Sequence, residues 1–106
     1  MKIRLDFVTN SSEVAYIIRN RTDTTKTLLD FIKELDHLID KYNERNDYPV
    51  SREDVYEDAE GRLWSVGPNE EAFLMLSWES DLLGIILAET LGSGSSESFS
   101  WHETDL

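Results

Sequence analysis

The chain contains no cysteine among its 106 residues. This absence excludes disulfide bonds, cysteine-ligated zinc, iron–sulfur clusters and a thiol nucleophile. The two histidines leave few ligands for any other zinc site. We therefore expect the fold to be stabilised by the packing of apolar side chains.

Basic side chains are scarce in the second half of the chain. Residues 1–50 hold eight Lys and Arg against nine Asp and Glu, whereas residues 51–106 hold only Arg52 and Arg62 against thirteen acids. The net charge of −12 therefore comes almost wholly from the second half. A surface this negative repels phosphate backbones and anionic lipids, so we expect no direct binding to nucleic acid or membranes. It favours solubility first, and a partner protein with a basic surface second.

Long apolar runs and catalytic fingerprints are also lacking. The longest apolar stretch, residues 82–88, is far shorter than the roughly 20 residues that a membrane-spanning helix needs. The first residues alternate charged and apolar side chains and form no signal-peptide core, so we expect a cytoplasmic protein. The sequence contains no nucleophile elbow, phosphate-binding loop or dinucleotide fingerprint. We expect no cofactor and no catalytic residues.

Several segments have the pattern of β-strands. Residues 3–8 alternate apolar and charged side chains, and residues 14–18 are rich in β-branched and aromatic side chains. The polar turn between these segments predicts a hairpin. Further strands are expected at residues 63–66, 72–78 and 99–103, and residues 93–96 are expected to form a flexible connector.

One long amphipathic helix is expected over residues 28–42. Its apolar stripe comprises Leu28, Phe31, Ile32, Leu35, Leu38, Ile39 and Tyr42. This spacing fits four helical turns with one face buried. Thr27 and Asp30 have the spacing of a capping box, and residues 46–49 end the helix at a proline.

A second, buried helix is expected over residues 82–91, which are apolar almost all round. Ser80 or Asp81 is available as its N-cap and Gly92 as its C-cap, although Gly84 leaves a strand possible.

Two readings remain open for residues 50–60. Ser51 could start a helix that ends at Gly61, or Gly61 could turn a hairpin that joins residues 55–56 to 63–64. The residues also leave open whether Trp64 and Trp101 are core side chains or exposed anchors. Taken together, the segments predict a single α+β domain over residues 1–106, with a mainly antiparallel sheet.

Four acidic residues form the one candidate metal site. Residues 76–82 and 99–106 both contain Ser-Trp and end in Glu-(Ser or Thr)-Asp-Leu. If the two segments lie side by side, their carboxylates could bind a hard divalent cation or act as an acid–base pair. These carboxylates belong to Glu79, Asp81, Glu103 and Asp105. The alternative is that Glu79 and Asp81 end a strand and cap a helix, while the last residues form a solvated tail.

The start of the chain resembles that of a group of proteins. Residues 1–12 read Met-Lys-Ile-Arg-Leu-Asp-Phe-Val-Thr-Asn-Ser-Ser, and Ile17 and Ile18 follow. This segment resembles the opening of many uncharacterised bacterial and phage-associated proteins, in which Phe-Val-Thr-Asn precedes a serine run and then Phe-Ile. Here Glu13 cuts the serine run short, and Tyr16 stands where Phe is usual. The resemblance implies a bacterial protein but no particular activity.

Three functions are compatible with these observations. The first is a non-catalytic interaction module whose acidic second half contacts a basic protein surface. The second is an inhibitor, similar to an immunity protein or antitoxin, that mimics the charge of nucleic acid. The third is a divalent-cation-binding protein or metal-dependent enzyme that uses the four carboxylates. The first needs the fewest features that the sequence does not show.

Overall fold

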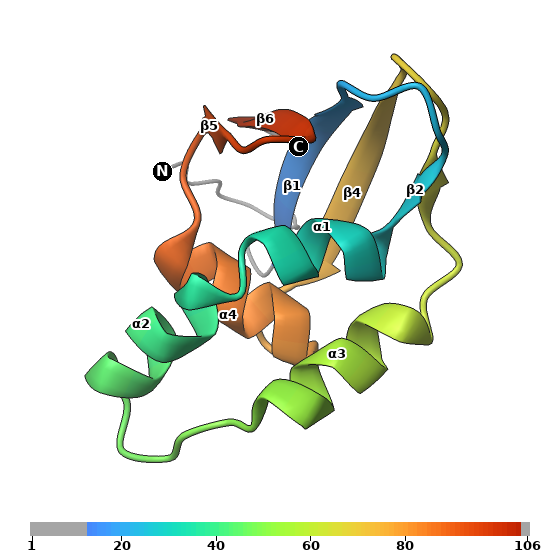
Figure 1. Ribbon diagram of the computed structural model, residues 1–106. Helices are drawn as coiled ribbons and strands as arrows, with labels where there is room; N and C mark the ends of the chain where they lie inside the picture. Colours follow the sequence, from blue (N-terminus) through green and yellow to red (C-terminus); the bar gives the residue numbers. More distant parts are fainter. Residues whose placement is uncertain (1–12, 105–106) are drawn as a thin grey trace.

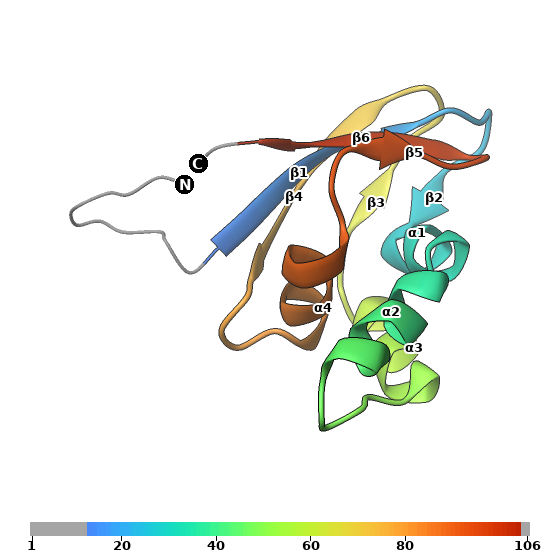
Figure 2. The same ribbon diagram turned by 90° about the vertical axis from the view of Figure 1, so that its left-hand side faces the viewer.

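The computed structural model describes residues 13–104, in which helices cover one face of a four-stranded antiparallel sheet (Figures 1 and 2). The strands, in spatial order, are β4 (Glu71–Ser77), β1 (Glu13–Asn20), β6 (Phe99–Thr104) and β5 (Gly94–Ser95). A separate pair joins β2 (Lys26–Thr27) to β3 (Ser65–Val66). The helices are α1 (Leu28–Glu34), α2 (His37–Arg45), α3 (Arg52–Glu60) and α4 (Leu82–Thr90). The predicted α+β class with a mainly antiparallel sheet is confirmed.

Strand β1 lies between β4 and β6 in the sheet, and alternate side chains of this strand are buried. Val14, Tyr16 and Ile18 are buried on the helix-covered face. The Tyr16 hydroxyl donates to the Leu87 carbonyl oxygen at 3.1 Å, which ties the central strand to α4. Burial of the Tyr16 ring and hydroxyl raises the pKa of the phenol, so it remains a neutral donor.

The predicted hairpin between residues 3–8 and 14–18 is wrong in its pairing. One edge of β1 pairs with β4 from Glu13 to Arg19, and the other pairs with β6 from Ala15 to Asn20. A strand has only two edges, so none is left for a neighbour in sequence. Residues 3–8 themselves lie outside the described residues.

An aromatic cluster forms the core between the sheet and α1. The Phe31 ring packs edge-to-face on Phe99 and on Trp101, with centroid distances of 5.1 and 5.4 Å. The Trp101 indole N–H donates to the Gly92 carbonyl oxygen at 2.7 Å. Trp101 is therefore a core residue with its polar edge satisfied, as buried indoles require. Trp64 is half-buried, and its indole N–H donates to the Phe73 carbonyl oxygen at 3.0 Å.

The expected long helix is two helices, because the chain breaks at Leu35. Its amide donates to the carbonyl oxygen of Ile32, and the Ile39 amide donates to that of Asp36, so both bonds span three residues rather than four. The Asp36 carbonyl oxygen also accepts a hydrogen bond from Arg52 of α3 at 3.0 Å. The apolar stripe continues across the break, which is why its spacing alone predicted one helix. The capping box of Thr27 is confirmed.

The two open regions of the second half are both helical. Ser51 caps α3 by accepting a hydrogen bond from the Asp54 amide at 3.0 Å, so the helix reading of residues 50–60 is correct and the hairpin is not. The buried helix is confirmed as α4. Within residues 13–104, no helix is long and apolar enough to cross a membrane.

The remaining strand predictions hold with small shifts. β4 and β6 begin and end within one residue of the expected strands. The strand expected at residues 63–66 is reduced to the two residues of β3, and the expected connector at 93–96 contains β5.

Gly84 is fixed by the close approach of α4 to the end of β4. A Cβ at this position would lie 2.0 Å from the Ser77 carbonyl oxygen, which is backbone and cannot turn away. Glycine therefore lets α4 pack on the strand that precedes it in the sequence.

We predict that Gly84→Ala lowers the free energy of unfolding by about 3 kcal/mol, because overpacking forces the backbone apart. Gly92→Ala is the matched control, since a Cβ there meets nothing within 4 Å. Urea denaturation measures both. A loss at Gly84 no larger than the loss at Gly92 would contradict the packing described.

Candidate interaction surface on helix α3

The four carboxylates of the predicted metal site are only partly described. Glu79 and Asp81 follow β4, whereas Glu103 lies in β6, and β1 separates these two strands. The two segments are therefore not side by side. Asp105 lies outside the described residues, so the complete set stays a prediction. Among residues 13–104, no group of three or more His, Asp or Glu could hold a metal ion.

Asp81 has a clear structural role. Its carboxylate accepts the Ser77 amide at 3.0 Å and pairs with Arg62 at 3.2 Å. Arg62 also pairs with Asp58 of α3 at 3.5 Å, so one guanidinium links α3 to the start of α4. The Ser77 N–H, and then Arg62, hold the pKa of Asp81 below its usual value. Asp81 does not cap α4 with its side chain, as the sequence suggested it could.

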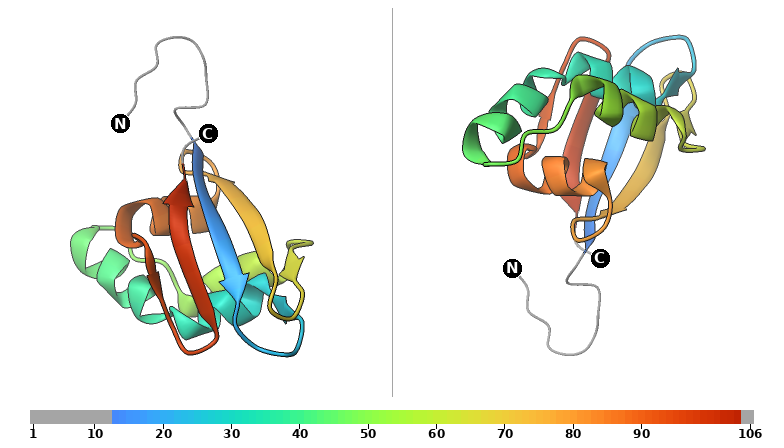
Figure 3. Two further views of the ribbon diagram at one scale, coloured as in Figure 1. Left: turned by 90° about the horizontal axis from the view of Figure 1, so that it is seen from above. Right: turned by 90° about the horizontal axis from the view of Figure 1, so that it is seen from below.

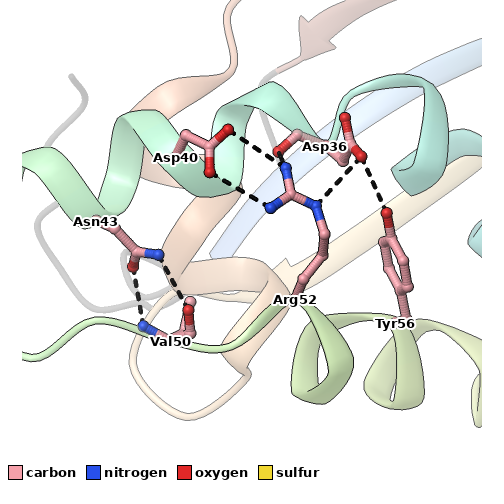
Figure 4. Close-up of polar contacts among 6 residues, drawn as sticks. All are labelled: Asp36, Asp40, Asn43, Val50, Arg52 and Tyr56. Atoms are coloured by element: carbon pink, nitrogen blue, oxygen red, sulfur yellow. Dashed lines mark hydrogen bonds and ion pairs between the residues drawn. The ribbon is translucent and has the colours of Figure 1, made fainter.

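Arg52 makes a second set of contacts, between α3 and α2 (Figure 4). Its guanidinium pairs with Asp36 at 3.3 Å and with Asp40 at 3.3 Å. The Tyr56 hydroxyl donates to the same Asp36 carboxylate at 3.0 Å. Partial burial, and then this hydrogen bond, raise the pKa of Tyr56 and keep its proton in place. These contacts hold α3 against the break between α1 and α2.

The loop that leads into α3 is held by an amide side chain. Asn43 accepts the Val50 amide at 2.9 Å and donates to the Val50 carbonyl oxygen at 3.0 Å (Figure 4). The two bonds fix the loop between α2 and α3 and thereby the position at which α3 starts.

Both basic residues of the second half thus pair with carboxylates of the same chain. Arg52 faces the carboxylates of α2, and Arg62 faces Asp58 and Asp81. No other Lys or Arg occurs in residues 51–106. The remaining acids of this half have no basic residue in their own segment to pair with.

The outer face of α3 collects four of these acids, which we call the acidic ridge. The ridge consists of four exposed residues, Glu53, Asp54, Glu57 and Glu60. Glu53, Glu57 and Glu60 are four and three residues apart, so they lie along one side of the helix. In the described part of the chain, none of the four forms an ion pair.

An exposed apolar side chain lies beyond each end of α3. Tyr48, in the loop before α3, is 87% exposed, and Leu63, three residues after it, is fully exposed. Apolar anchors beside charged residues are typical of protein–protein interfaces. The spacing of Glu53, Glu57 and Glu60 was visible in the sequence, but only the structure shows that Arg52 and Arg62 pair with other carboxylates.

No protein-family model matches the chain, and no curated protein sequence or solved structure matches it either.

We predict that Asp81→Asn lowers the free energy of unfolding at pH 7 by about 1 kcal/mol, the size typical of a partly exposed charged hydrogen bond and ion pair. A carboxyl with a lowered pKa in the folded state stabilises the protein above the unfolded pKa of about 3.9, and this stabilisation is lost as the pH falls through the folded value. The difference between wild type and variant should therefore shrink below about pH 4.

Urea denaturation at a series of pH values measures this difference. Asp23→Asn, at an exposed carboxylate without an ion pair among residues 13–104, is the control and should match the wild type at pH 7. A constant difference between wild type and Asp81→Asn down to pH 2 would show that the Asp81 charge does not contribute.

Proposed function

We propose that the protein is a non-catalytic interaction module that binds a protein with a basic surface through the acidic ridge of α3. One observation carries this proposal. Arg52 and Arg62 pair with carboxylates elsewhere in the chain, and no ion pair among residues 13–104 involves a carboxylate of the ridge. A basic partner would supply the missing countercharge.

The ridge is also rigidly placed. The Arg52 contacts fix the start of α3 and the Arg62 contacts fix its end. A preorganised surface loses little conformational entropy when it binds. Tyr48 and Leu63 add exposed apolar area beyond the two ends of the helix.

The inhibitor hypothesis is a narrower form of the same proposal. A surface that mimics nucleic acid must present repeated negative charges on a fixed frame, and the ridge does so along two turns of α3. The distinction lies in the partner, which must then be a nuclease or another nucleic-acid-binding protein.

The test compares the proteins that three immobilised forms of the chain capture from a cell lysate. The forms are the wild type, a ridge variant and a matched control. The ridge variant is Glu53→Gln with Glu57→Gln and Glu60→Gln. The matched control, Asp23→Asn with Glu44→Gln and Glu97→Gln, removes the same charge from exposed positions outside the ridge. We expect a basic protein to be retained by the wild type and the control, to elute as salt rises, and to be retained at least tenfold less by the ridge variant.

The electrostatic part of this interaction is screened by salt, with a Debye length of about 10 Å at 0.1 M. A captured nuclease or DNA-binding protein would favour the inhibitor form. Equal retention by the ridge variant and its control, or retention that salt does not affect, would contradict the proposal.

A further inference from the structure

A second surface lies on the opposite side of the molecule from the helices. All four helices cover one face of the sheet, and the other face is open in the described residues (Figures 2 and 3). Strand β4 forms one edge of this sheet. Phe73 and Met75 of β4 are 48% and 46% exposed, whereas the alternating Leu74 and Leu76 are buried beneath the helices. The open face therefore carries apolar side chains along its edge strand.

The backbone of β4 is unpaired along part of its outer edge. Asn20 donates to the Glu70 carbonyl oxygen, so the even-numbered residues of β4 face β1. Because an antiparallel ladder alternates, the odd-numbered residues direct their N–H and C=O groups away from β1. The Trp64 indole N–H donates to the outward carbonyl oxygen of Phe73, and the Asp81 carboxylate accepts from the outward amide of Ser77. Between them, the outward N–H and C=O of Met75 have no hydrogen-bond partner among residues 13–104.

The charges along this edge indicate what would bind there. Glu71 begins the strand and Glu79 follows its end by two residues, and both are exposed. Neither forms an ion pair within the described chain. Arg19 is paired with Glu71 in the register, but it lies in β1, on the side of β4 away from the free edge. Adjacent strands are about 4.8 Å apart, so a segment added at this edge would be separated from β1, and therefore from the backbone of Arg19, by two strand spacings.

We propose that the free edge of β4 binds an extended segment of another protein, with an apolar centre and a basic residue at each end. The segment would add a strand at Met75, place its apolar side chains beside Phe73 and Met75, and direct its cations to Glu71 and Glu79. Strand addition of this kind takes affinity from main-chain hydrogen bonds and specificity from alternate side chains. This surface shares no residue with the acidic ridge, so it does not depend on the function proposed above.

The probe is a fluorescent eight-residue peptide with two lysines at each end and Val-Thr-Val-Thr between them. We expect its anisotropy to show saturable binding to the full chain. A peptide with glutamates in place of the lysines should bind at least tenfold more weakly. Met75→Lys should also weaken binding at least tenfold, whereas Leu63→Lys, at an exposed apolar position outside this surface, should leave it unchanged.

Two methylated peptides test the strand pairing itself. One is N-methylated on both valines and the other on both threonines. Only alternate N–H groups of a strand face one neighbour, so one of the two peptides should lose binding and the other should keep it. Binding that both peptides retain, or that Met75→Lys does not change, would overturn the proposal.

Two further measurements separate this proposal from self-association of the chain and from the function proposed for α3. If the wild type dimerises in sedimentation equilibrium and Met75→Lys is monomeric, the occupant is a second copy of the chain and the proposal is wrong. The ridge variant should bind the peptide as the wild type does, because its substitutions lie on α3. Failure of the peptide to bind would leave the function proposed for α3 intact, and failure of capture by α3 would leave this one intact.

Discussion

Two guanidinium groups join helix α3 to the helices beside it. Arg52 joins α3 to α2 through Asp36 and Asp40, and Arg62 joins α3 to α4 through Asp58 and Asp81. Exposed ion pairs contribute little to stability one at a time, so their main effect here is on position. They set where α3 lies across the other helices (Figure 1). They also take up both basic residues of an acidic half-chain, which leaves the outer face of α3 negative.

Both surfaces contain polar groups that have no partner among the described residues. On the helix side, Arg52 and Arg62 pair with carboxylates outside the ridge, and the ridge acids remain exposed at the surface. On the sheet side, the helices cover only one face, and Trp64 and Asp81 engage the edge of β4 on either side of Met75. Natural sheets protect their edges, and here the protection is interrupted around Met75. The proposed partner strand would add at this interruption, which shares no residue with the acidic ridge.

Local patterns in the sequence predicted the positions of most helices and strands correctly. They did not predict which of these elements contact one another. The apolar stripe of α1 and α2, the Ser51 cap and the buried α4 could be found because each depends on near neighbours. The break at Leu35 could not, since it involves Arg52 from a later helix. The hairpin of residues 3–8 failed for a similar reason, because β4 and β6 occupy both edges of β1. The acid spacing of the ridge was visible, but its lack of counterions depends on tertiary ion pairs.

The central claim is that the acidic ridge serves binding and not folding, and the stability of the ridge variant tests it most directly. Glu53 lies near the positive end of the α3 dipole and Glu60 near the negative end, so removing both charges should nearly cancel. Urea denaturation of Glu53→Gln with Glu57→Gln and Glu60→Gln should give a free energy of unfolding within about 0.5 kcal/mol of the wild type, or higher, as expected at surface positions without partners. A loss of more than about 1 kcal/mol would mean that these carboxylates stabilise the fold, and would contradict the claim.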